Sequence, residues 1–214
     1  MEERARSVKT RVWGFVLVVT LSGCAFVPLV RAVKMEIPGL PQCSTVSDPT
    51  VEAYAASLMM RILAVTSHAY LADRYTLLLA DLRQCGGFAG VSSGGGTIYL
   101  DAGWARSAFK TRQLVETYVL MILAHEIGHE IAGHARQVKS DSYAPDRRGR
   151  VAARELEADR LAIGYWKTLG WPCLTWVRRF EKDIAHGDRG TWHHPTPDRL
   201  DQAKRLCSIG DSGA

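Results

Sequence analysis

The sequence predicts an α+β fold that is mostly helical and includes a small β-sheet. Several stretches repeat apolar residues with helical spacing, and the longest of them covers residues 114–131. Two short apolar blocks, at residues 75–82 and 97–101, have the length and composition of strands. The chain has 214 residues, which is enough for one domain with a sizeable hydrophobic core.

The N-terminal segment has the pattern of a bacterial lipoprotein signal. A basic stretch precedes the apolar run of residues 12–21, which is too short to span a bilayer. Residues 21–24 resemble a lipobox, whose cysteine, Cys24, would be lipidated and become the new N-terminus. A plain signal peptide that is cleaved nearby is the alternative. We expect a lipoprotein signal peptide at residues 1–23, a lipidated tether at 24–48 and the folded domain at 49–214.

A lipid on Cys24 would anchor the protein to a membrane of the bacterial cell envelope. Alanine, not aspartate, follows Cys24. By its resemblance to the sorting signals of enterobacterial lipoproteins, this implies the outer membrane, with the domain facing the periplasm. Removal of residues 1–23 takes away four of the 27 Lys and Arg and two of the 22 Asp and Glu, which leaves a net charge of +3. This charge is too small for a nucleic-acid-binding surface, so we expect no nucleic-acid partner.

Four cysteines remain once Cys24 carries lipid: Cys43, Cys85, Cys173 and Cys207. An even number in an oxidising compartment predicts two disulfides, for which there are three possible pairings. Proximity in the sequence favours Cys43 with Cys85 and Cys173 with Cys207. A structural zinc site is the alternative, but no CxxC spacing supports it.

The remaining elements follow from start and stop signals. Residues 34–47 have no period and predict a tether or an ordered loop, whereas Asp48 and Pro49 form a helix start signal. The glycine-rich residues 86–96 predict a loop, which is no phosphate cradle because no GK[ST] sequence follows. Helices are predicted at residues 49–65, 111–137, 151–169, 172–184 and 196–206, with a polar linker or flap at 138–149 and a histidine-rich loop at 186–195.

The predicted helix 111–137 carries an HExxH pattern at His125, Glu126 and His129. Residues four positions apart lie about 40° apart around a helix, so the two imidazoles project from one face. This spacing suits one zinc ion, and Glu126 points about 100° away, where it can hold a water molecule without binding the metal. Two chance histidines on a helix are the alternative. The pattern favours a zinc site with Glu126 as general base.

The third zinc ligand separates the families that carry HExxH. The extended pattern HExxHxxGxxH would require glycine at position 132 and histidine at position 135, and both positions are alanine. On a continuous helix His134 would face about 140° away from the ligand side, so it is not the third ligand. Glu155 and Asp159 share one face of the predicted helix 151–169; one can bind the metal while the other accepts the outer N–H of a ligand histidine. Glu157 lies on the opposite face and is expected to point to solvent.

Together these motifs resemble the HtpX/BepA-like gluzincin zinc metallopeptidases, in particular their periplasmic lipoprotein branch. The resemblance covers about residues 51–205 and includes HExxH with a histidine five residues later, the ExEAD segment at 155–159 and a His-Pro pair at 194–195. It implies that Glu155 is the third zinc ligand and that Asp159 supports a ligand histidine. It also implies that His194 approaches the zinc as a removable ligand or a transition-state donor, and that Arg199 pairs with a carboxylate near the site.

The resemblance further implies a strand beside the active-site cleft, to whose edge an extended peptide substrate adds. Ile98, Tyr99 and Leu100 are the residues expected in that strand. Of the other histidines, His134 is expected to lie behind the ligands or to be exposed. We expect His68 and His186 to be packed or surface residues and His193 to point away from its neighbour.

The sequence thus predicts a zinc-dependent endopeptidase with one zinc ion per chain, held by His125, His129 and Glu155 between two packed helices with the small sheet beside them. Glu126 and His194 are the expected catalytic residues. The resemblance implies that the substrates are misfolded or misassembled envelope proteins. The alternative is a latent or non-catalytic zinc-containing lipoprotein with a binding or chaperone-like role. A cytoplasmic regulatory metalloprotein is a third hypothesis, which a functional signal peptide would exclude; the oligomeric state is not predicted.

Overall fold

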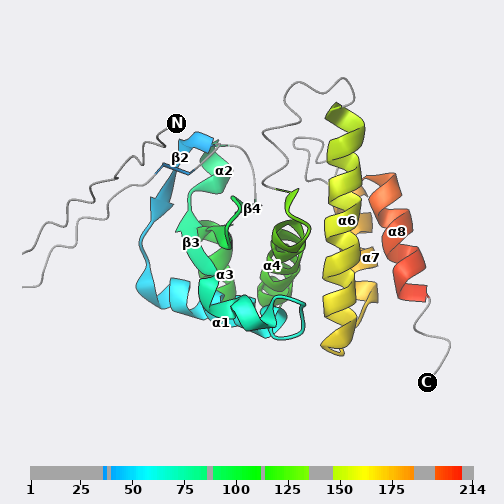
Figure 1. Cartoon of the computed structure of the whole chain (residues 1–214), viewed down its shortest axis with the longest axis horizontal. Coiled ribbons are helices and arrows are strands. Elements are labelled where there is room, and N and C mark those ends of the chain that lie inside the picture. The colour runs from blue at the N-terminus through cyan, green and yellow to red at the C-terminus, as the bar shows by residue number, and fades with distance from the viewer. Residues whose placement is uncertain are drawn as a thin grey trace, which may run out of the picture. The chain divides into compact units, whose positions relative to one another are not determined.

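The structure, a computed structural model, describes residues 36–37, 40–85, 89–111, 114–134, 147–185 and 196–208. All of these residues belong to one unit, Ala32–Ala214. They form an α+β fold that is mostly helical, which confirms the predicted fold class (Figure 1). The elements in chain order are β1 (Glu36–Ile37), β2 (Leu40–Val46), α1 (Pro49–Leu63), the 3-10 helix η1 (Ala69–Arg74), β3 (Thr76–Ala80), α2 (Leu82–Cys85), β4 (Gly90–Ser92), β5 (Thr97–Asp101), α3 (Ala102–Thr111), α4 (Leu114–Ile131), α6 (Arg147–Thr168), α7 (Leu174–Ala185) and α8 (Pro197–Ser208).

The strands form one mixed sheet in the order β1-β2-β3-β5-β4. β3 and β5 run parallel, and the other neighbouring strands are antiparallel. β3 and β5 are the two strands that the apolar blocks predict. The helices α1, α3 and α4 pack against them, so both strands are rich in buried residues and do not alternate between apolar and polar.

β2 lies in the segment where we expected a tether or a loop, and that expectation is wrong. Thr45 and Val46 pair with β3, and Cys43 is buried in a small cluster with Leu82 and Tyr99. β2 pairs with β1, which precedes it in the chain, and with β3, which follows it. Its own sequence does not alternate between apolar and polar residues. A strand that depends on its partners in this way leaves little trace in its own sequence.

The first helix begins where its start signal predicts. The Asp48 side chain caps α1 by accepting from the Val51 backbone N–H at 3.4 Å, and Pro49 occupies the first turn. Helix α3 was not predicted. α3 buries only small residues, Ala102, Ala105 and Ala108, whose weak hydrophobicity gives no clear helical period.

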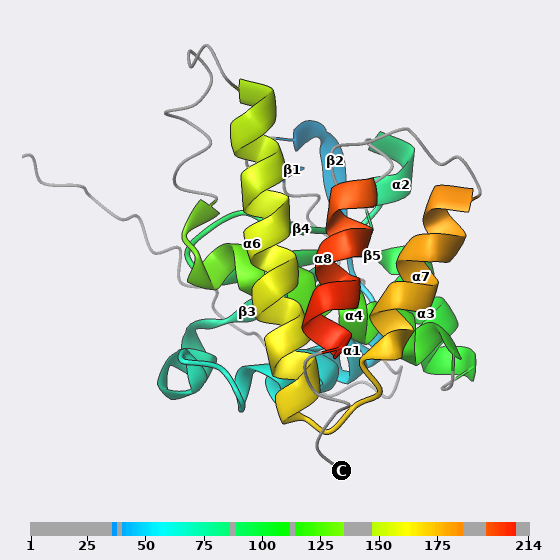
Figure 2. The same cartoon turned by 90° about the vertical axis from the view of Figure 1, so that its right-hand side faces the viewer.

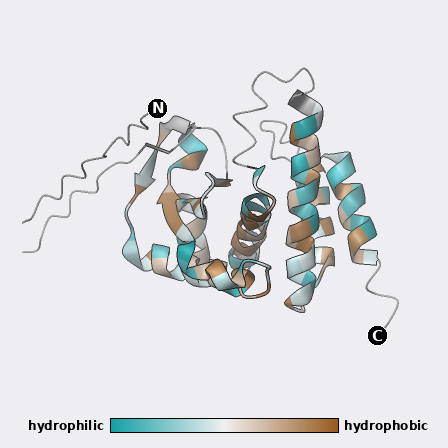
Figure 3. Cartoon of the chain, in the orientation of Figure 1, coloured by the Kyte–Doolittle hydropathy of each residue, from teal (hydrophilic) through white to brown (hydrophobic). Residues whose placement is uncertain are grey.

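Helix α4 lies at the centre of the fold and contacts α1, α3, α6, β4 and β5. Every residue from 119 to 129 is buried, and the helix is predominantly hydrophobic along its length (Figure 3). It therefore has no polar face in this stretch. The HExxH pattern lies at the C-terminal end of the buried stretch, which places its polar side chains inside the protein.

The C-terminal helices α6, α7 and α8 pack together, with α8 between the other two (Figure 2). α6 begins at Arg147, inside the predicted polar linker at 138–149, whose residues 138–146 lie outside the described part of the chain. The side chains of Trp166, Trp176 and Phe180 belong to the main hydrophobic core. In the described residues, no helix has the length and apolar character needed to cross a membrane.

The predicted Cys173–Cys207 disulfide is present and joins the start of α7 to the end of α8. Cys43 is also disulfide-bonded. The side chain of its expected partner, Cys85, lies outside the described residues, as does Cys24.

Candidate metal centre

The HExxH residues of α4 face helix α6 across a close contact. A Cβ atom added at Gly128, in the middle of the motif, would lie 2.7 Å from the Ala158 carbonyl oxygen of α6. Any side chain at Gly128 would therefore separate the two helices. The contact brings Glu155, one turn before Asp159 on α6, to the two histidines of α4.

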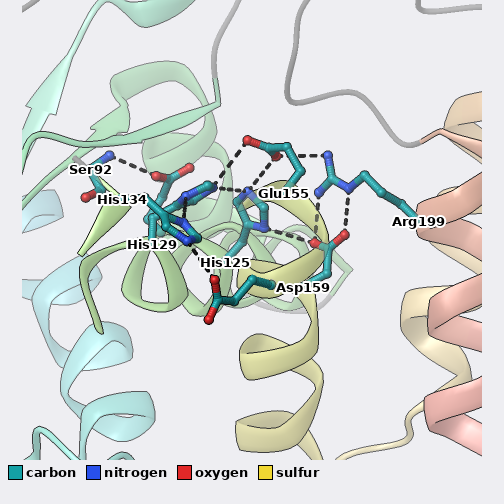
Figure 4. Close-up of polar contacts among 9 residues, drawn as sticks. Ser92, His125, His129, His134, Glu155, Asp159 and Arg199 are labelled. Atoms are coloured by element: carbon teal, nitrogen blue, oxygen red, sulfur yellow. Dashed lines mark hydrogen bonds and ion pairs between the residues drawn. The ribbon is translucent and has the colours of Figure 1, made fainter. Parts of the chain in front are cut away.

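His125, His129 and Glu155 form a buried group that could hold a metal ion (Figure 4). Their ligand atoms all lie within 4.8 Å of one another. Nε2 of His125 lies 3.2 Å from Glu155 Oε2, and Nε2 of His129 lies 3.4 Å from Glu155 Oε1. The two Nε2 atoms are 3.0 Å apart. The structure thus brings together the three residues that the sequence analysis assigned to the metal.

His125 is supported from behind by Asp159. Its Nδ1 lies 2.9 Å from Asp159 Oδ1, and an ionised carboxylate only accepts, so Nδ1–H is the donor. Arg199 donates to both oxygens of the same carboxylate, from Nε at 2.6 Å and from Nη2 at 2.8 Å. Its third nitrogen, Nη1, is 3.1 Å from Glu155 Oε2. Arg199 therefore links the carboxylate that supports one histidine to the carboxylate of the candidate ligand set.

His129 is supported through a second histidine. Its Nδ1 lies 2.8 Å from Nδ1 of the buried His134, and Nε2 of His134 lies 3.1 Å from Glu157 Oε2. Since Glu157 accepts, His134 donates from Nε2, and its Nδ1 is then the acceptor for Nδ1–H of His129. Helical extrapolation placed His134 on the far side, but α4 ends at Ile131 and Gly133, at φ 71°, turns the chain back.

Glu157 was expected to face solvent, and half of its side chain does so. The Glu157 carboxylate also contacts His134, and the HExxH spacing alone does not indicate this contact. The contact depends on the turn after α4 and on the packing of α6 against it, and neither is visible in the local pattern. A carboxylate at the surface is in this way connected to a buried candidate ligand.

The two histidines and Glu155 have a donor set that fits a divalent metal ion. Because both rings donate from Nδ1, the Nε2 atom of each neutral ring carries a lone pair. These lone pairs point toward one another and toward the Glu155 oxygens, at 3.0–3.4 Å. Acceptor atoms this close repel unless a metal ion or a proton lies between them. Two imidazole nitrogens and one carboxylate are also a common ligand set for zinc in catalytic sites.

The pKa values of the charged residues agree with a site that attracts positive charge. Burial lowers the pKa of His125, but its hydrogen bonds to Asp159 and Glu155 outweigh burial and raise the pKa to about 10. Burial raises the pKa of Asp159, yet the positive charge of Arg199 leaves it below its ordinary value. A metal ion would replace the proton that these carboxylates favour on His125.

Two further groups at the site, Arg199 and His134, have pKa values shifted by the same kinds of cause. Burial lowers the pKa of Arg199, but the attraction of Asp159 and Glu155 exceeds that effect and keeps the pKa above its ordinary value. For His134 burial is the larger influence, and it lowers the pKa despite the hydrogen bond to Glu157. A neutral His134 is the form that can accept from His129.

Glu126 is only 3% exposed and lies against strand β4. The Ser92 backbone N–H donates to Glu126 Oε2 at 2.8 Å (Figure 4). Gly90 makes this approach possible, because a Cβ there would lie 2.6 Å from the Ile122 side chain and 3.0 Å from Glu126 Cγ. β4 lies inside the predicted glycine-rich loop at 86–96, and its three residues, which include Gly90, are too few to give a strand signal.

The position of β4 corrects the expected substrate strand. Ile98, Tyr99 and Leu100 belong to β5, which pairs with β3 on one side and with β4 on the other. Because both edges of β5 are occupied, these residues cannot accept another strand. The edge strand that contacts α4 is β4, which lies at the end of the sheet order.

His194, the proposed second catalytic residue, lies outside the described residues, as do His186 and His193. Comparison with known proteins adds nothing to the assignment: no model of a protein family matches the chain, and no curated protein matches it. The chemistry of this protein has to be argued from the site itself.

Proposed function

We propose that this protein is a zinc-dependent endopeptidase with one zinc ion per chain. The observation that carries the proposal is the buried group of His125, His129 and Glu155, with Glu126 one residue after the first histidine. Three protein ligands that include two histidines and a glutamate are typical of zinc peptidases, where a fourth position is left for water or substrate. The resemblance of the motifs to HtpX/BepA-like peptidases supports the same class.

The charges of the site favour a divalent ion. Glu126, Glu155 and Asp159 are buried carboxylates, and Arg199 is the buried cation that contacts two of them. A dication would offset the remaining negative charge, whereas buried carboxylates without a counter-charge are costly. The metal ion therefore contributes to stability as well as to chemistry.

Each residue has a role in hydrolysis. His125, His129 and Glu155 would hold the zinc ion, which would lower the pKa of water to about 7 and polarise the substrate carbonyl. Glu126 takes the proton from the attacking water and later gives it to the leaving amine. Its carboxylate is held toward the site by the Ser92 N–H. Asp159 and Arg199 keep His125 in the tautomer whose Nε2 would bind the metal.

A peptide in extended conformation is the proposed substrate. β4 is an edge strand beside the general base, and an edge strand can pair with an added strand through its backbone. The backbone N–H of Ser93 donates to Thr97, and the carbonyl of Ala89 accepts from Asp101, both in β5. The alternation of the ladder therefore turns the backbone groups of Gly90 and the carbonyl of Ser92 toward the other edge of β4, while the Ser92 N–H donates to Glu126. β4 thus takes the role that we expected of β5.

The proposed setting is the bacterial cell envelope, with a lipid on Cys24 and envelope proteins as substrates. This part of the proposal is supported by the signal-like segment before Cys24, by the Cys173–Cys207 disulfide, which is typical of an oxidising compartment, and by the resemblance. His194 would contribute at the rim of the site. The competing function is a zinc-containing binding protein without turnover.

Proteolysis by the full chain distinguishes these functions. We would follow cleavage of casein by the zinc-loaded parent, by Glu126→Gln and by Glu181→Gln, a control on α7 that is half exposed and pairs with Lys204. The parent and the control should cleave at equal rates, and a chelator should stop both until zinc is restored.

Glu126→Gln should keep its zinc and lose at least about a hundredfold in rate, because it cannot accept the proton. Equal cleavage by Glu126→Gln would show that Glu126 is not the base. A zinc-loaded parent that cleaves nothing would favour the binding protein.

A further inference from the structure

Glu130 follows the candidate ligand His129 on α4, and its carboxylate lies in a turn made of glycines. The backbone N–H groups of Gly94 and Gly96 donate to it at 2.6 and 2.9 Å. The Ser92 hydroxyl donates to Oε1 of the same carboxylate. Hydrogen bonds to a charged acceptor are stronger than those between neutral groups, so this is a firm connection between α4 and the sheet.

The glycine triplet is what lets the turn surround the carboxylate. Gly94, Gly95 and Gly96 have φ values of 87°, 71° and 87°, a conformation that L side chains rarely adopt. At Gly96 a Cβ would also lie 2.7 Å from the Arg74 carbonyl oxygen. Left-handed turns of this kind direct backbone N–H groups into a concavity that binds an anion. Here the anion is the side chain of Glu130.

The turn joins β4 to β5, so its attachment to Glu130 also fixes the end of β4. Ser92 is the last residue of β4 and contacts two carboxylates, Glu130 through its hydroxyl and Glu126 through its backbone N–H. Glu126 and Glu130 are four residues apart and lie on the same face of α4. The end of β4 is therefore held both by Glu126, the general base, and by Glu130, one turn later on α4.

We propose that Glu130 is a positioning residue, which holds the 94–96 turn so that the Ser92 N–H orients the carboxylate of Glu126. The inference rests on the proposed function, in which Glu126 is the general base. It assigns a role to the glycine triplet that the metal site alone does not explain. The alternative is that Glu130 stabilises the 94–96 turn and has no effect on Glu126.

The test compares Glu130→Ala and Glu130→Gln with the control Glu181→Ala in the full zinc-loaded chain. Three quantities are measured: zinc per chain, amide hydrogen exchange at Ser92, Gly94 and Gly96, and kcat and KM on a peptide substrate. The Ser92 amide is the decisive probe, because its acceptor is Glu126 and not the residue that is changed.

With Glu130→Ala we expect the Ser92 amide to exchange at least about tenfold faster and kcat to fall between about tenfold and a hundredfold, the range that a misplaced catalytic group can cost. KM and bound zinc should stay near the parent values. Glu130→Gln keeps one acceptor oxygen and should lie between the parent and Glu130→Ala. Glu181→Ala should match the parent.

The proposal would be overturned by faster exchange at Gly94 and Gly96 with no change at Ser92, or by an unchanged kcat. Glu130 would then only stabilise the 94–96 turn. An inactive parent would instead count against the proposed peptidase. In that case the exchange of the Ser92 amide would still decide whether Glu130 positions Glu126, so the two failures are distinguishable.

Discussion

At the scale of single residues, the two candidate histidine ligands differ in how they are supported. His125 is held by Asp159, which is fully buried, and His129 is held by His134, whose other nitrogen reaches the half-exposed Glu157. Residues behind a metal ligand fix its tautomer and orientation, and their replacement typically lowers metal affinity by about 10- to 100-fold. Metal binding at this site should therefore respond to a residue at the protein surface.

Replacement of Glu157 tests this connection. Glu157→Ala removes the acceptor that fixes His134, so His129 loses part of its orientation. We expect the zinc affinity to fall about tenfold, the lower end of the range for such residues, because the side chain is half exposed. Competition with a fluorescent zinc chelator measures the affinity, and Glu181→Ala is the matched control. An affinity equal to that of the parent would mean that His134 needs no fixed tautomer.

Arg199 is the buried cation of the site, and its loss should be costly. Arg199→Ala would leave Asp159 and Glu155 without their guanidinium, and removal of one partner of a buried ion pair costs roughly 3–5 kcal/mol. Arg199→Lys should recover only part of this, since an ammonium group cannot contact both carboxylates in the same way. Urea unfolding measures the loss. Arg205→Ala, at an exposed position of the same helix, should stay within about 0.5 kcal/mol.

At the scale of elements, the site depends on the close contact between α4 and α6. Gly128→Ala would place a methyl group against the Ala158 carbonyl, which is backbone and cannot move aside. We expect a loss of about 1–3 kcal/mol in unfolding free energy and weaker zinc binding, because Glu155 moves away with α6. Gly164→Ala, on α6 with open space around it, should instead stabilise the protein by up to about 1 kcal/mol. Equal behaviour of the two variants in unfolding would contradict this.

The elements that the sequence predicted correctly are those with a local signal. α1 has its cap at Asp48, β3 and β5 are apolar blocks, and α4 carries a long apolar period. β2, β4 and α3 were missed because their signals are not local. β2 and β4 depend on pairing with partner strands, and the buried face of α3 is made of alanines.

The candidate site divides in the same way. Fixed spacing on α4 and α6 was enough to name His125 and His129 and to leave Glu155 or Asp159 as the third ligand, because four-residue intervals place side chains on one face; the resemblance to a known family then favoured Glu155. The contacts around them were not predictable. His134 reaches His129 only because Gly133 ends the helix with a positive φ, and Ser92 reaches Glu126 only because Gly90 lets β4 approach. For the contact between Ser92 and Glu126, the sequence offered two hints: the glycine triplet at 94–96 and Glu130, one turn after Glu126.

At the scale of the whole molecule, the metal should link the two halves of the structure. α4 packs on the sheet side with α1 and α3, and α6 packs with α8, so a metal ion held by both helices joins these groups. A ligand that binds only the folded state stabilises it by about 2.7 kcal/mol at a hundred times its dissociation constant. We expect a chelator to lower the midpoint of thermal unfolding, and zinc to restore it. A midpoint that does not respond would contradict a structural contribution of the metal.

The metal centre is tested most directly by the amount of zinc bound by the purified full chain, measured by elemental mass spectrometry for the parent and for Glu155→Ala. We expect about one zinc ion per chain in the parent and a large loss in the variant, because two histidines alone hold zinc weakly. A parent without zinc after exposure to it would contradict the metal centre. Undiminished zinc in Glu155→Ala would contradict the assignment of Glu155 as the third ligand.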